Sequence, residues 1–203
     1  MQFKISSRRT LSIITLLGFA IFLGVFSHST LKGPAQSNSA MLIENIAAIP
    51  GLEQVNFSLP VRLKIPSIGV DALVEYVGFT PDGAMDTPKE RANVAWFNFG
   101  PRPGENGSAV IAGHYGWKNG KASAFDNLYK LRKGDILYIE DNKGEIISFV
   151  VRDFQSFDPK ADASDVFGSP DGKSHLNLIT CGGAWDKTQK SYSKRLVVFT
   201  DKE

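Results

Sequence analysis

Apolar and polar residues alternate with a period of two in several short segments after residue 57. From residue 61 to residue 65, apolar side chains at the odd positions alternate with Arg62 and Lys64, and Pro66 ends the run. This period is typical of a strand with one face against a core. Further strands are predicted at 70–77, 108–112, 136–140, 146–154, 176–180 and 195–200.

Turn-forming residues separate these segments. Pro81-Asp82-Gly83 favours a turn, and the Asp-Asn-Lys-Gly sequence at 141–144 favours a hairpin. Loops are predicted at 99–107, 158–174 and 182–194, and one short helix at 125–131. With about eight short strands, almost no helix and no internal repeat, the chain is predicted to be all-β. A closed or nearly closed barrel would hide the strand edges.

The N-terminus has a different pattern. Lys4, Arg8 and Arg9 precede an uncharged apolar run at 11–26, which is 16 residues long and at the short end of what spans a bilayer. The basic flank predicts a cytoplasmic N-terminus and an exported remainder. A cleaved signal peptide remains an alternative, although no clear A-x-A site follows. A buried core helix fits the basic flank poorly.

Three parts of the chain are therefore expected. Residues 1–30 form a cytoplasmic stub and a transmembrane signal-anchor, and the polar, breaker-rich residues 31–56 form an extracellular linker. Residues 57–203 form the folded barrel domain.

Composition argues against several classes of function and site. The net charge is only +2, and 42% of the residues are apolar and 22% are charged. This composition does not indicate a nucleic-acid-binding protein. The single cysteine rules out a disulfide within the chain. The three histidines do not share ligand spacing with it, and acidic residues in the 158–174 loop are typical of a solvated loop. No metal and no cofactor is expected.

Cys181 is the first candidate for chemistry. It lies where the 176–180 strand is predicted to end, before Gly182 and Gly183, which let backbone N–H groups approach a substrate. A buried structural cysteine is the alternative. Because free thiols outside the cytoplasm are exposed to oxidation, an unpaired cysteine in an exported chain favours a functional role.

A cysteine nucleophile needs a base or a cation nearby. His114 follows the 108–112 strand, with Gly113 before it and Gly116 two residues after it, whereas His28 is too close to the apolar run. His175 starts the strand that leads to Cys181, roughly 16 Å away at the opposite end. If the last two strands pair antiparallel, Arg195 lies beside Cys181 and could support an oxyanion, with Lys194 sharing that role. A loop histidine and a solvated arginine remain the structural alternatives for these two residues.

Together these segments resemble the sortases, the cysteine transpeptidases of the bacterial cell surface. The resemblance covers about residues 60–200, and the stretches that carry it are 62–71, 100–114, 125–135, 178–181 and 195–198. Leu178-Ile179-Thr180-Cys181 matches the last four positions of the T-L-x-T-C motif, and Asn177 departs from its first. The order histidine, cysteine, arginine is specific to the family.

The resemblance implies an eight-stranded sortase β-barrel with short helices in its loops. Cys181 would attack the threonine carbonyl of a C-terminal sorting signal like L-P-x-T-G, and an amine acceptor such as a cell-wall precursor would resolve the thioester. His114 would be the acid–base, Arg195 would hold the substrate and support the oxyanion, and Thr180 would help bind substrate. The partners would be secreted proteins with such signals and, through the N-terminal helix, the lipid of the bacterial cell membrane.

Other interpretations stay open from sequence. Gly182-Gly183 with Trp185-Asp186 resembles the class F pattern, whereas classes D and E share the short architecture. An L,D-transpeptidase would carry S-H-G-C-x-R around its cysteine, which this chain lacks. A cysteine peptidase that hydrolyses the same thioester and a non-catalytic surface binding module on the same scaffold are the remaining alternatives.

Overall fold

The computed structural model describes residues 58–117, 120–169 and 171–203. The predicted membrane helix and linker lie outside these ranges. Within them, no helix has the length and apolar character needed to cross a bilayer.

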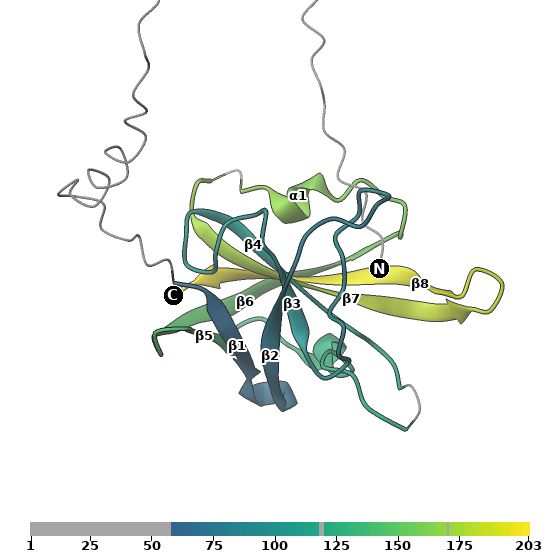
Figure 1. Cartoon of the computed structure of the whole chain (residues 1–203), viewed down its shortest axis with the longest axis horizontal. Coiled ribbons are helices and arrows are strands. Elements are labelled where there is room, and N and C mark those ends of the chain that lie inside the picture. The colour runs from purple at the N-terminus through teal and green to yellow at the C-terminus, as the bar shows by residue number, and fades with distance from the viewer. Residues whose placement is uncertain (1–57, 118–119, 170) are drawn as a thin grey trace, which may run out of the picture. The chain divides into compact units, whose positions relative to one another are not determined.

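Eight strands form one closed barrel in the order β1-β2-β3-β4-β7-β8-β6-β5 (Figure 1). The strands are β1 (Pro60–Ile65), β2 (Val70–Val77), β3 (Val94–Phe97), β4 (Gly107–Gly113), β5 (Ile136–Asp141), β6 (Ile146–Phe157), β7 (Ser174–Asp186) and β8 (Ser191–Lys202). The helical segments are η1 (Pro66–Ile68), η2 (Leu128–Lys130) and α1 (Ser164–Phe167). The prediction of an eight-stranded closed barrel with short helices in its loops is confirmed.

The sheet is mixed. β2 pairs with β3 and β4 pairs with β7 in parallel, while the other neighbours are antiparallel. Parallel pairing brings the ends of β4 and β7 to the same edge of the barrel. The residue that follows β4 is therefore carried toward the residues late in β7.

Alternation along the strands sorts side chains into two apolar clusters. One fills the barrel interior and includes Leu63 and Ile65 of β1, as their odd-numbered pattern predicts, and Leu176 and Leu178 of β7. The other lies on the outer face of β4, β7 and β8 and includes Ile179 and other buried side chains. We use "outer face" for this surface below.

The segment between β6 and β7 covers part of the outer face. It was predicted as a loop, but it contains α1, and Val166 and Ala163 pack against Ile179, Val197 and Ala112. Figure 1 shows α1 on the side of the barrel where β4 lies. This packing explains why β4 and β7 are apolar on both faces, with little alternation for a sequence pattern to show.

One strand was missed from the sequence, and one loop prediction is wrong. β3 was not predicted, because all four of its residues are buried and no polar position breaks the run. The prediction of a loop at 182–194 is wrong, because β7 continues to Asp186 and β8 begins at Ser191. Cys181 therefore lies within a long strand and not at a strand end.

Candidate active site

Cys181 faces Arg195 across the β7–β8 ladder. The two residues are register partners, as are Thr180 and Leu196 beside them. Directly opposed residues of antiparallel strands project from the same face of the sheet. Cys181 is half-buried and unpaired, and it lies two residues after Ile179 on the outer face, so both side chains share that face.

His114 reaches the same place from β4. In the parallel ladder Ala112 pairs with Ile179, so His114 and Cys181 each lie two residues further along adjacent strands. The hydroxyl of Thr180 donates to the carbonyl of Gly113 at 2.8 Å and fixes this register. Because side chains alternate along a strand, His114 follows Ala112 onto the outer face.

The His114 ring is held by the segment between β2 and β3. Its Nε2 lies 2.8 Å from the carbonyl oxygen of Pro88. Burial lowers the pKa of His114 below its usual 6.5, and the nearby Arg91 lowers it further, while the bond to Pro88 and the Glu75 carboxylate oppose the shift. The neutral imidazole is therefore favoured near pH 7.

Arg195 is buried, with 3% of its surface exposed. Its Nη1 donates to the carbonyls of Tyr192 at 3.1 Å and Lys194 at 2.9 Å, and its Nη2 is 3.4 Å from the Ser191 hydroxyl. These bonds turn the guanidinium along β8 toward the hairpin. Lys194, predicted to share its role, is exposed and pairs with Asp158 at 3.0 Å.

The three predicted residues thus come from β7, from β8 and from the residue that follows β4 to one region of the outer face. Among the described residues, no hydrogen bond joins Cys181 to His114 or Arg195. Catalytic hydrogen bonds are often long before substrate binds and tighten in the complex, so the arrangement fits a site that substrate completes.

Cys181 and Arg195 each line a cleft. One of about 270 Å³ is lined by Cys181 itself, Thr180, and the aromatic side chains of Tyr115, Phe125 and Tyr129. The other, of about 700 Å³, is lined by Arg195 and by residues of the β7–β8 hairpin and of the segment after β6. The cysteine and the arginine therefore line two different clefts.

Tyr115 and Tyr192 of this site were missed from sequence. The Tyr192 ring packs edge-on to both Tyr115 and Trp185, with centroids 5.1 and 5.0 Å apart. Burial, Tyr115 and Cys181 all raise the pKa of Tyr192. Isolated aromatics in predicted loops gave no signal, because their meeting depends on the extended hairpin.

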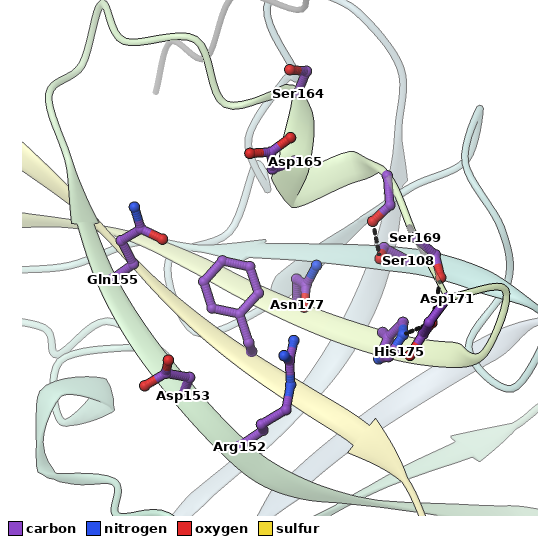
Figure 2. A pocket seen from close by; sticks show the side chains of 12 residues that line it. Ser108, Arg152, Asp153, Gln155, Ser164, Asp165, Ser169, Asp171, His175 and Asn177 are labelled. Atoms are coloured by element: carbon purple, nitrogen blue, oxygen red, sulfur yellow. Dashed lines mark hydrogen bonds and ion pairs between the residues drawn. The ribbon is translucent and has the colours of Figure 1, made fainter.

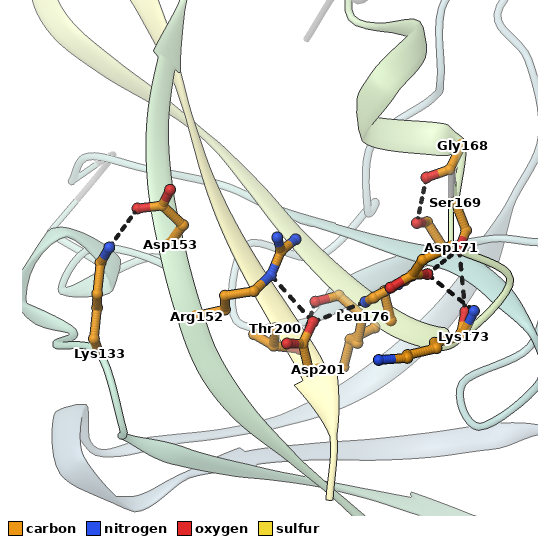
Figure 3. A network of polar contacts seen from close by, with 12 residues as sticks. Lys133, Arg152, Asp153, Gly168, Ser169, Asp171, Lys173, Leu176, Thr200 and Asp201 are labelled. Carbon is orange, nitrogen blue, oxygen red and sulfur yellow. Dashed lines mark hydrogen bonds and ion pairs between the residues drawn. The ribbon is translucent and has the colours of Figure 1, made fainter.

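His175 lies at the opposite end of β7, as predicted. Its Nδ1 and Nε2 are each 2.8 Å from a carboxylate oxygen, of Asp201 and Asp171 respectively, and Asp201 also accepts from Arg152 (Figure 3). The bond to His175 holds the pKa of Asp171 well below its usual range. The imidazole thus links the segment before β7 to β8.

A pocket of about 560 Å³ adjoins this network, with Arg152, Asn177 and His175 on its walls (Figure 2). Asn177 departs from the sortase motif. It is buried and donates to the carbonyl of Val166 in α1 at 2.7 Å, so it serves packing beneath that helix. Within the described ranges, no group of three or more His, Cys, Asp or Glu residues has metal-binding geometry.

Comparison with known proteins assigns the family. The Sortase domain family model matches residues 63–203, which contain all three residues of the candidate site. The chain belongs to the sortase family. Sortases are cell-surface cysteine transpeptidases that act on sorting signals and cell-wall amine acceptors, and this class of reaction is that of the present chain.

Solved structures agree with this assignment. Sortase C-1 from Actinomyces oris is 27% identical, with 71% of this chain and 74% of that chain covered and a TM-score of 0.57. The Group B Streptococcus pilus island 1 sortase C2 is 26% identical, with 70% and 72% covered and a TM-score of 0.55. Sortase A from Corynebacterium diphtheriae is 24% identical, with 71% and 60% covered and a TM-score of 0.57, and shows the shared fold. A search of curated proteins returned no match.

Proposed function

We propose that Cys181 is the nucleophile of this transpeptidase, His114 its acid–base and Arg195 its oxyanion support. The observation that carries the proposal is the register of the barrel. Cys181 faces Arg195 directly, and the parallel ladder brings His114 to the same outer face. A cysteine, a base and a cation in one place are the parts that acyl transfer through a thioester requires.

In the first half-reaction, neutral His114 takes the proton of the Cys181 thiol, and the resulting thiolate attacks the threonine carbonyl carbon of the sorting signal. Arg195 stabilises the negative oxygen of the tetrahedral intermediate. The C–N bond then breaks, and the leaving amine takes its proton from protonated His114. The product is a thioester on Cys181.

In the second half-reaction, an acceptor amine attacks the thioester and gives its proton to His114. The C–S bond breaks, the leaving Cys181 thiolate takes this proton from His114, and a new amide joins the signal to the acceptor. Both groups return to their starting protonation states. No step requires a cofactor.

The cleft beside Cys181 supports a role in holding the sorting signal. Its walls of Tyr115, Phe125 and Leu196 suit apolar side chains next to the threonine. Thr180 also lines this cleft, although its hydroxyl is already used by Gly113. We assign Thr180 to substrate positioning through the β4–β7 register.

Residues 1–30 are proposed as a single-pass anchor with the N-terminus in the cytoplasm, followed by the 31–56 linker and the catalytic domain from residue 57. The support is the basic flank and the uncharged run at 11–26. An anchored enzyme would meet secreted substrates at the outer membrane face. The class F resemblance of residues 182–186 stays a prediction.

The test is intact mass spectrometry of the full-length protein with an L-P-x-T-G peptide library and an added amine. A thioester on Cys181 that converts to a peptide–amine product is expected. An adduct that gives only hydrolysed peptide, with every amine tried, would favour the peptidase alternative. No adduct with any signal peptide would favour a binding module.

Variants assign the roles. Cys181→Ala should abolish the adduct without changing the melting temperature, because the thiol has no bonding partner among the described residues. His114→Ala should lower kcat about 100-fold or more, the usual size of an acid–base contribution. His175→Ala is the matched histidine control, and a larger loss there than at position 114 would show that the assigned base is wrong.

A further inference from the structure

Glu75 of β2 fastens the segment that leads to β3. Its Oε2 accepts from the backbone N–H of Lys89 at 2.8 Å, and its Oε1 accepts from the N–H of Glu90 at 3.1 Å and from the Asn93 side chain at 2.9 Å. These bonds lower the pKa of Glu75, against the effect of burial, so the carboxylate is ionised at neutral pH. One side chain therefore fixes three points between residues 89 and 93.

The fastened segment in turn holds His114 and the residues after it. The Pro88 carbonyl, next to the first of the fixed points, lies 2.8 Å from His114 Nε2. Arg91 donates to the carbonyls of Tyr115 and Gly116, and its own carbonyl accepts from the N–H of Ala124 at 2.9 Å. Residues 88–93 thus hold His114 and the residues after it in place through hydrogen bonds.

The contact with Pro88 decides where the proton of a neutral His114 resides. A backbone carbonyl can only accept, so Nε2 carries the hydrogen and Nδ1 keeps the lone pair. Nδ1 is then the atom that takes and returns protons. A partner that fixes the tautomer of a catalytic histidine acts on rate rather than on binding.

We propose that Glu75 is a positioning residue for acyl transfer, which acts through the 88–93 segment and the Pro88 carbonyl to hold His114 in the Nε2–H form with Nδ1 facing the reaction. The proposal rests on the acid–base role of His114. It assigns a function to a carboxylate in a strand that contributes no other residue to the site.

The direct test is the tautomer of His114 in the full-length protein, measured by long-range ¹H–¹⁵N NMR and assigned with His114→Gln. The wild type should show Nε2–H. In Glu75→Gln only one acceptor oxygen remains, so Lys89 or Glu90 loses its partner and His114 should become a mixture of tautomers. A spectrum unchanged from wild type would overturn the proposal.

The kinetic test compares Glu75→Gln with Glu140→Gln, a half-buried glutamate whose ion pair with Lys64 at 3.2 Å is remote from this segment. Glu75→Gln should lower kcat about 10- to 100-fold, the range for losing an outer-shell partner of a functional histidine, at unchanged KM. Glu140→Gln should match wild type. Wild-type kcat in Glu75→Gln would overturn the inference.

Two further measurements keep the outcomes separate. If Glu75→Gln does not fold, Asn93→Ala, which removes one bond and leaves the carboxylate, takes its place and should give a smaller change of the same kind. If His114→Ala keeps wild-type turnover, the proposed function of His114 fails, whereas the tautomer measurement still decides whether Glu75 orients the ring.

Discussion

At the scale of single residues, Arg195 has two tasks that must be separated. It is buried and holds the carbonyls of Tyr192 and Lys194 in the β7–β8 hairpin. It also faces Cys181 across the ladder. A loss of activity on its removal could therefore come from a missing cation or from a displaced hairpin.

Arg195→Ala should lower kcat/KM by about 100- to 1000-fold, the usual cost of losing oxyanion support. It should also lower the free energy of unfolding by about 1–3 kcal/mol, because carbonyl groups lose their donor. Arg195→Lys keeps the charge but loses the guanidinium, whose Nη1 serves both carbonyls and whose Nη2 reaches the Ser191 hydroxyl, so it should recover part of the activity. Kinetics and urea unfolding of both variants measure this, and wild-type kcat/KM in Arg195→Ala would exclude the role.

His114 should titrate below pH 6.5, because burial lowers its pKa. The unfolded chain then binds a proton more readily than the folded one between these two pKa values. The contribution of His114 to stability is therefore complete above pH 6.5 and is lost as the pH falls through the folded pKa. An NMR titration of the ring measures the midpoint, and a value above 6.5 would contradict the expected effect of burial.

At the scale of elements, the sequence predicted strands best where one face is solvated. The alternation in β1 and the turn residues between β5 and β6 are local signals, and both features were found. β3 was missed because both of its faces are buried. The extension of β7 past Cys181 was missed because glycines at 182 and 183 indicate a loop, whereas the structure uses them in an irregular stretch of ladder before Trp185.

The position of Arg195 beside Cys181 could be predicted from sequence, whereas the contacts that hold His114 could not. Pairing of the last two strands needs only their order, so the prediction that Arg195 lies beside Cys181 is confirmed by the register. Glu75 and Pro88 gave no signal, since their contact with the site depends on how the 88–93 segment folds back. Tertiary contacts of this kind have no period in a sequence.

Gly183 tests the irregular stretch of β7. Its φ is +76°, and an added Cβ would lie 2.4 Å from the Ser193 hydroxyl oxygen and 3.1 Å from Lys194 Cγ. Gly183→Ala should displace the hairpin and lower kcat about 10-fold or more, because small misplacements at a site are costly. Gly134→Ala is the control, since its φ of +92° is equally strained but nothing lies within 4 Å. Equal kcat in both variants would exclude a positional role.

At the scale of the whole molecule, the barrel has two apolar layers: one filling its interior and one beneath α1. The second layer occupies the outer face between Cys181 and the His175 network. The proposed catalytic residues therefore stand at one end of a packed surface, in β7, in β8 and directly after β4. Rigid elements hold a site more accurately than loops do.

The N-terminal segment should determine where this barrel works. The full-length protein is expected in the membrane fraction after an alkaline wash, and removal of residues 1–30 should release it with its peptide turnover intact. Leu17→Arg places a charge within the apolar run and should weaken insertion, since arginine costs about 2.5–3.5 kcal/mol at a helix centre. Recovery of the full-length protein in the soluble fraction would contradict the anchor, and intact mass would show whether the segment is retained.

The position of β7 in the barrel also sets when the enzyme can first act. β7 lies between β4, formed some sixty residues earlier, and β8, the last strand of the chain. Before β8 has paired, Cys181 has no arginine beside it and no closed wall around it. The β4–β7 pairing joins residues far apart in the chain, and pairings of this kind slow folding. If Cys181 is the nucleophile, its site is complete only once β8 has paired with β7, and reactivity toward a sorting signal would then report that β8 is in place.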